Sequence, residues 1–142
     1  MINVCEVSKR MQTPLCPDDL VIAVLHRVRG RHNERVFPTE RERLHSAFFE
    51  LKQRHPDLFH DFHFRNKGFF YESEELDQAL CNLEASRLLH RHNETPKYYF
   101  VQVRLDRSYE EFVKGKLAEL GVNEGRMVEV AGEFNLLVSG AR

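Results

Sequence analysis

Residues 73–103, SEELDQALCNLEASRLLHRHNETPKYYFVQV, constrain the fold more than any other part of this 142-residue chain. Ser73 is a favourable helix N-cap, and apolar side chains then recur at helical spacing, at Leu76, Ala79, Leu80, Leu83 and Leu88. The run of tyrosine, phenylalanine and valine at 98–103 has high strand propensity, and the polar segment 93–96 is typical of a turn. We therefore expect a helix from Ser73 to about Leu89 that leads directly into a β-hairpin.

Two further helices are expected before this segment. The first covers about Pro17 to Arg29, because proline suits a first helical turn and apolar residues follow at helical spacing. A polar loop, RGRHNERVFP, follows at residues 29–38. Thr39 and Glu42 have the spacing of a capping box, which predicts a second helix that starts there and ends at His55, before proline.

An aromatic segment, FHDFHFRNKGFFY, connects the second and third helices at residues 59–71. Its centre, Asn66-Lys67-Gly68, predicts a turn, within either a short hairpin or a packed loop. The aromatic side chains are expected to fill core volume in a chain without tryptophan, and an exposed partner surface is the alternative.

The C-terminal part is expected to be helical. Ser108 and Glu111 form a second capping box, Phe112, Val113, Leu117 and Leu120 are the apolar positions, and Gly121 suits a helix end. For residues 123–139 a helix capped by Asn123 is preferred over a strand at FNLLV. Because no repeat or linker interrupts the chain, we expect one domain over 1–142, with its core at about 17–103 and a helical extension at about 106–139.

Composition limits the classes of protein to consider. The longest apolar run, Leu20 to Leu25, is far too short to span a membrane, and the N-terminus has no secretory signal pattern. Three cysteines, Cys5, Cys16 and Cys81, predict apolar packing residues in a reducing cytoplasm rather than a disulfide framework. The net charge of −1 divides into an excess of three basic residues over 1–70 and four acidic residues over 71–142. Neither half has the excess typical of a strong nucleic-acid binder.

No pattern of catalysis is present. The chain lacks the GXSXG, P-loop, GXGXXG and HEXXH motifs, so we expect no enzyme activity and no cofactor. The histidine pairs His60/His63 and His90/His92 lack a clear third ligand, so we expect no metal site. The densest cationic stretch, HRVRGRHNER at 26–35, is interpreted as a solvated helix end and loop, with contact to phosphates or an acidic partner as the alternative.

The order helix, helix, aromatic turn, helix and hairpin resembles the winged helix-turn-helix superfamily. The phrase ELDQALCNLEASRLLHR is similar to the third helix of that superfamily and its exit into the hairpin called the wing. The resemblance covers about residues 17–103, and it implies an α+β winged helix with additional terminal helices. In DNA-binding members the third helix enters the major groove and the wing contacts the backbone or the minor groove. The terminal helices of such regulators are often used for dimerisation, so a homodimer is expected.

Carried onto this sequence, the resemblance implies nucleic-acid contacts at Gln78, Asn82, Arg87, Arg91 and Lys97. It also places Glu74, Glu75 and Asp77 near the bases, where carboxylates beside phosphates are costly. The leading expectation is a sequence-specific DNA-binding transcriptional regulator. The alternative is a winged-helix module that binds protein through its acidic helix or its aromatic segment, and the charge of the folded third-helix face distinguishes the two.

Overall fold

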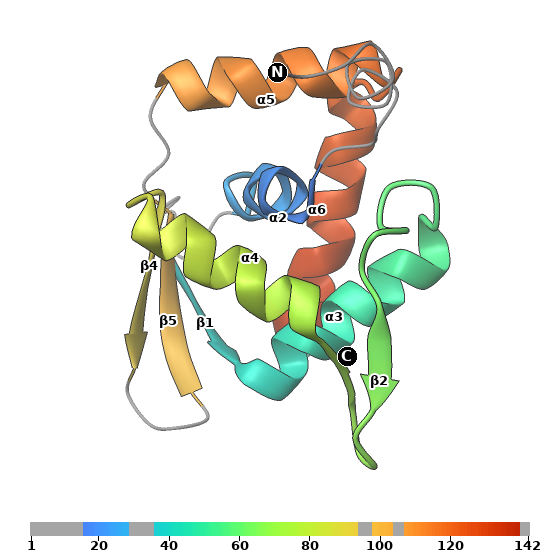
Figure 1. Ribbon diagram of the computed structural model, residues 1–142, viewed down its shortest axis with the longest axis vertical. Helices are drawn as coiled ribbons and strands as arrows, with labels where there is room; N and C mark the ends of the chain where they lie inside the picture. Colours follow the sequence, from blue (N-terminus) through green and yellow to red (C-terminus); the bar gives the residue numbers. More distant parts are fainter. Residues whose placement is uncertain (1–15, 29–35, 94–97, 104–106, 140–142) are drawn as a thin grey trace, which may run out of the picture.

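The computed structural model describes residues 16–28, 36–93, 98–103 and 107–139. It is a mixed α+β fold, as the sequence predicts (Figure 1). The elements in chain order are α2 (Pro17–Leu25), β1 (Val36–Glu40), α3 (Arg41–Arg54), β2 (Phe64–Asn66), β3 (Tyr71–Ser73), α4 (Glu74–Ala85), β4 (Leu89–Asn93), β5 (Tyr98–Val103), α5 (Arg107–Glu119) and α6 (Glu124–Ser139).

Two antiparallel sheets are present among these residues. The larger has the strand order β1-β5-β4, and the smaller is the hairpin of β2 and β3. Strand β1 comes between the first two helices in sequence, yet it pairs with β5, with Val36 opposite Gln102 and Glu40 opposite Tyr98. The hairpin partner of β5 is β4, with Leu89 opposite Val103.

Strand β1 corrects two sequence predictions. Residues 36–38 belong to a strand rather than to a polar loop, while residues 29–35 of that predicted loop lie outside the described part of the chain. Thr39 is not a helix cap, because it lies in β1 opposite Tyr99 and helix α3 is preceded by Glu40, whose side chain makes no capping bond. The pairing partner is some 60 residues away, so no local pattern indicated the strand. The predicted helix end at His55 is confirmed.

Helix α2 occupies the centre of the molecule, beneath α5 and beside α4 and α6 (Figure 1). Its residues Leu20 to Leu25 are at most 1% exposed. On the other side of the core, Phe48 of α3 packs against Phe59, Phe62 and Phe134, with ring centroids 5.2 to 5.9 Å apart. Helices from both ends of the described chain therefore share one apolar core.

The C-terminal segments are helical, and the preferred helix at 123–139 is confirmed. The Asn123 side chain accepts a hydrogen bond from the Arg126 amide at 2.8 Å and so caps α6. Helix α5 begins at Arg107, so Ser108 is its second residue rather than its cap. Phe112 is 51% exposed and does not join the buried side of α5.

Cys16 and Cys81 are exposed rather than packed in the core, which corrects the prediction for both; Cys5 lies outside the described residues. Within the described ranges, no helix has the length and apolar character needed to cross a membrane.

Candidate nucleic-acid interface

Helix α4 lies between two hairpins, beginning where β3 ends and leading into β4 after three residues (Figure 1). Ser73 caps its start as predicted, because the Ser73 hydroxyl accepts from the Leu76 amide at 3.3 Å. At the other end Arg87 adopts a left-handed φ of 62°, and the Leu88 amide donates to the Leu83 carbonyl at 2.9 Å. This is the Schellman geometry that ends a helix, with arginine where glycine is usual. Both ends of α4 are thus fixed by local hydrogen bonds.

The outward side of α4 is uncharged along its middle. The exposed residues there are Gln78, Cys81, Asn82 and Ala85. The Gln78 amide donates to the Asn82 side-chain oxygen at 2.9 Å, and the Asn82 amide donates to Asp18 of α2 at 3.1 Å. The helix therefore presents a polar and neutral strip to solvent.

The acidic first turn of α4 is compensated within the fold. Asp77 accepts hydrogen bonds from Arg41 at 2.5 Å and from the His45 ring at 2.9 Å, and both partners belong to α3. Burial alone would raise the pKa of the Asp77 carboxyl, but the hydrogen bonds from His45 and Arg41 hold that pKa below its ordinary value. The Asp77 carboxylate is therefore directed toward α3.

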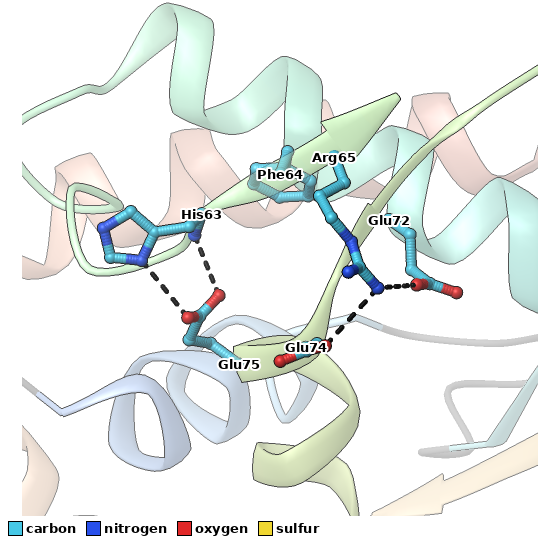
Figure 2. A pocket seen from close by; sticks show the side chains of 6 residues that line it. All are labelled: His63, Phe64, Arg65, Glu72, Glu74 and Glu75. Carbon is cyan, nitrogen blue, oxygen red and sulfur yellow. Dashed lines mark hydrogen bonds and ion pairs between the residues drawn. The ribbon is translucent and has the colours of Figure 1, made fainter. Parts of the chain in front are cut away.

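Glu75 and Glu74 contact the β2–β3 hairpin (Figure 2). The Glu75 carboxylate accepts from the His63 amide at 2.9 Å and lies 3.2 Å from the His63 ring. Burial would raise the pKa of Glu75, and these bonds lower it below its ordinary value. Glu74, whose side chain is 77% exposed, lies 3.4 Å from Arg65, which also lies 3.4 Å from Glu72. Each acid at the start of α4 thus has a cationic or histidine partner nearby.

His45 joins three elements at this point. Its ring is fully buried, and its Nδ1 accepts a hydrogen bond from the Ser73 amide at 3.1 Å. Since Nδ1 accepts, the proton resides on Nε2, which donates to Asp77. The ring therefore links α3 to the residue that caps α4 and to the first turn of that helix.

The predicted contact residues fall into three groups. Gln78 and Asn82 lie together on the exposed side of α4, and Arg87 is exposed at its exit. Arg91 of β4 is half-buried and donates to Glu84 at 2.6 Å, so its guanidinium already has a carboxylate partner. Lys97 lies outside the described residues.

The cationic stretch at 26–35 is described only in its first three residues. Arg27 donates to both carboxylate oxygens of Glu124, at 2.8 and 2.5 Å, so it ties α2 to α6. His60 and His63, which lie three positions apart in the sequence, have separate partners, since His60 lies 3.1 Å from Asp61 while His63 contacts Glu75. Among the residues with described positions, no three histidine, cysteine or acidic side chains gather as a metal site would require.

Sequence reasoning missed the part played by the β2–β3 hairpin beside α4. Arg65 of this hairpin and His63, the residue before β2, line an open pocket together with Glu72, Glu74 and Glu75 (Figure 2). The turn signal at 66–68 indicated the hairpin, but nothing in the sequence indicated that its charges would offset those of α4. Comparison of the chain with family models, with curated proteins and with solved structures finds no match.

Proposed function

We propose that this protein is a winged helix-turn-helix DNA-binding protein. In this assignment α2, α3 and α4 are the three helices, β1 is the first strand, and β4 and β5 are the wing. The observation that carries the proposal is the strand order β1-β5-β4, in which the strand between the first two helices pairs with the last strand of the wing. The β2–β3 hairpin is then an insertion between the second and third helices.

The surface of α4 supports DNA as the partner. Gln78 and Asn82 carry amide side chains, which can pair with the exposed edge of adenine in the major groove. Arg87 follows at the helix exit, where a cation suits a phosphate. Arg91, held by Glu84, serves to position the first wing strand in this proposal.

Electrostatics favours DNA over the alternative, a module that binds protein through an acidic helix. A protein-binding acidic face needs free carboxylates, whereas Asp77 and Glu75 are bonded to Arg41, His45 and His63. Asp77 is thereby paired with a guanidinium, Glu75 is hydrogen-bonded within the fold, and the exposed middle of α4 is uncharged.

The proposed setting is transcriptional control by a homodimer. Val128 and Leu136, 56% and 61% exposed, lie two helical turns apart on one side of α6, where a second copy would cover them. Leu136→Glu should then convert the dimer to a monomer in sedimentation analysis. A wild-type protein that sediments as a monomer would contradict the dimer while leaving DNA binding unaffected.

The test of DNA binding is a fluorescence anisotropy titration against a random-sequence duplex pool at about 50 and 200 mM salt, between which phosphate contacts lose most of their affinity. We expect salt-dependent binding by the wild type, with a salt slope reduced by about 0.9 in Arg87→Ala, since each phosphate contact contributes about that much. Lys114→Ala on α5 is the matched control and should keep the wild-type slope. No binding at low salt would refute the proposal and favour the protein-binding module.

A second measurement addresses base contacts. After selection of a preferred duplex, Gln78→Ala and Asn82→Ala should lose discrimination against a changed base pair by about 1–3 kcal/mol, while binding to the random pool changes little. Unchanged discrimination in both variants would mean that α4 does not read bases.

A further inference from the structure

The β2–β3 hairpin ends in a tight turn that exposes a large aromatic side chain. The Lys67 amide donates to the Phe70 carbonyl at 2.8 Å, and the Gly68 amide donates to the Asn66 side-chain oxygen, also at 2.8 Å. Gly68 has a backbone φ of +104°, which residues other than glycine rarely adopt. Phe69, the next residue, is 78% exposed.

The hairpin is held firmly against α3, so the exposed position of Phe69 is fixed by its neighbours. Tyr71 stacks on Phe49 with ring centroids 4.1 Å apart, and Phe64 packs edge-on against the same ring at 5.4 Å. Phe70 lies under the Arg41 guanidinium at 5.9 Å and against His45 at 6.2 Å. Three rings of the hairpin, Phe64, Phe70 and Tyr71, thus anchor it to α3, and Phe69 is far more exposed than Tyr71, at 78% against 39%.

Charge distinguishes this turn from an ordinary apolar contact surface. Lys67 is exposed two residues before Phe69. Arg65 lies at the base of the turn, 3.4 Å from both Glu72 and Glu74, and Glu72 also accepts a hydrogen bond from Arg41 of α3 at 2.8 Å. The end of the hairpin therefore presents one cation and one aromatic ring, and its acids lie behind them with Arg65 as partner. A phosphate beside an apolar sugar or base edge matches this pair of groups.

We infer that the tip of the β2–β3 hairpin is a second DNA contact, at the end of α4 opposite the wing. Lys67 pairs with a phosphate, Phe69 contacts the sugar or base edge next to it, and Arg65 is a positioning residue that holds the Glu72 and Glu74 carboxylates at the base of the hairpin. The inference rests on the proposed function. The two hairpins lie at opposite ends of α4, so the two proposed contacts lie at opposite ends of that helix (Figure 1).

Two matched pairs of variants test this contact in the same anisotropy assay with the random duplex pool. Lys67→Ala should lower the salt slope by about 0.9, whereas Lys114→Ala on α5 should not. Phe69→Ala should weaken binding at least about fivefold with the salt slope unchanged, because it removes an apolar contact. Phe112→Ala, which removes an exposed phenylalanine from α5, should bind like the wild type. Far-UV circular dichroism confirms that each variant is folded.

The outcomes separate the two proposals. If Arg87→Ala lowers the salt slope while Lys67→Ala and Phe69→Ala match their controls, the hairpin contact is wrong and the proposed function stands. If the wild type shows no salt-dependent binding, both are wrong. If Phe69→Ala instead abolishes a self-association of the wild type and leaves DNA affinity unchanged, Phe69 is a protein contact and the inference is overturned.

Discussion

Asp77→Ala should destabilise the protein more than Glu74→Ala, the substitution of an exposed acid in the same turn of α4. The change leaves the Nε2 proton of the fully buried His45 ring without its acceptor, which costs about 1–3 kcal/mol. It also removes the ion pair with Arg41, where both side chains are about a third exposed and the expected contribution is only about 0–1 kcal/mol. Loss of a negative charge at the helix N-terminus adds about 0.3–1 kcal/mol. We expect the free energy of unfolding to fall by about 2–4 kcal/mol.

Glu74→Ala is the matched control. Glu74 lies in the same turn and interacts with the same helix dipole, but its side chain is 77% exposed and its contact with Arg65 is 3.4 Å long. The loss should stay below about 1 kcal/mol. The difference between the two variants therefore isolates the contacts with His45 and Arg41.

The assay is urea unfolding at neutral pH, followed by far-UV circular dichroism. Asp77→Asn should recover part of the loss, since its side-chain oxygen still accepts from His45 but carries no charge for Arg41. Equal destabilisation by Asp77→Ala and Glu74→Ala would refute the argument, because the buried acceptor would then contribute nothing.

Three further predictions follow from charges and backbone geometry. The folded-state pKa of Asp77 lies below its unfolded value, so its stabilisation is present above about pH 4 and is lost as the pH falls below that; Asp77→Ala should flatten the acid side of the pH–stability curve. Burial and then the hydrogen bond to Asp19 raise the pKa of Tyr109, so its stabilisation is present below about pH 10 and is lost above it. Tyr109→Phe should remove that alkaline loss in urea titrations from pH 8 to 11, and it should lower stability by about 1–3 kcal/mol at pH 7. Gly68→Ala should cost about 1–2 kcal/mol in a thermal melt because of its φ of +104°, although the added methyl group would meet open space; an unchanged melting temperature would contradict this.

Local signals account for most of the helices and both hairpins. Ser73 and Asn123 cap helices because a side-chain oxygen can reach an amide three residues later, and that spacing is visible in the sequence. The turn at 66–68 is visible for the same reason, since its glycine and asparagine bond within the turn itself. The predicted helix caps at Thr39 and Ser108 were wrong, although each residue is followed by glutamate at the spacing of a capping box. Thr39 lies in β1, which pairs with β5, and α5 begins one residue before Ser108.

The candidate interface was predicted only in part. Gln78 and Asn82 are exposed on α4, and Arg87 is exposed just after it. This exposure could be predicted, because an amphipathic helix places its polar residues opposite its buried apolar ones. The partners of the acids beside these residues were not predicted, because Arg41 lies 36 positions from Asp77 in the chain and His63 lies 12 positions from Glu75. Phe69 was grouped with aromatic residues expected in the core, with an exposed surface as the alternative, because a sequence does not distinguish a ring that anchors a turn from one that extends beyond it.

The sequence by itself indicated the helices, the turn at 66–68, the caps at Ser73 and Asn123 and the helix end at His55, since caps, apolar spacing and glycine act over a few residues. Only the tertiary structure decided that β1 pairs with β5, that Asp77 faces Arg41 of α3, and that Glu75 and Glu74 face His63 and Arg65. It also decided that Phe69 remains in solvent. These outcomes depend on pairings between distant segments, and such pairings are fixed by the packing of the whole core rather than by any local pattern.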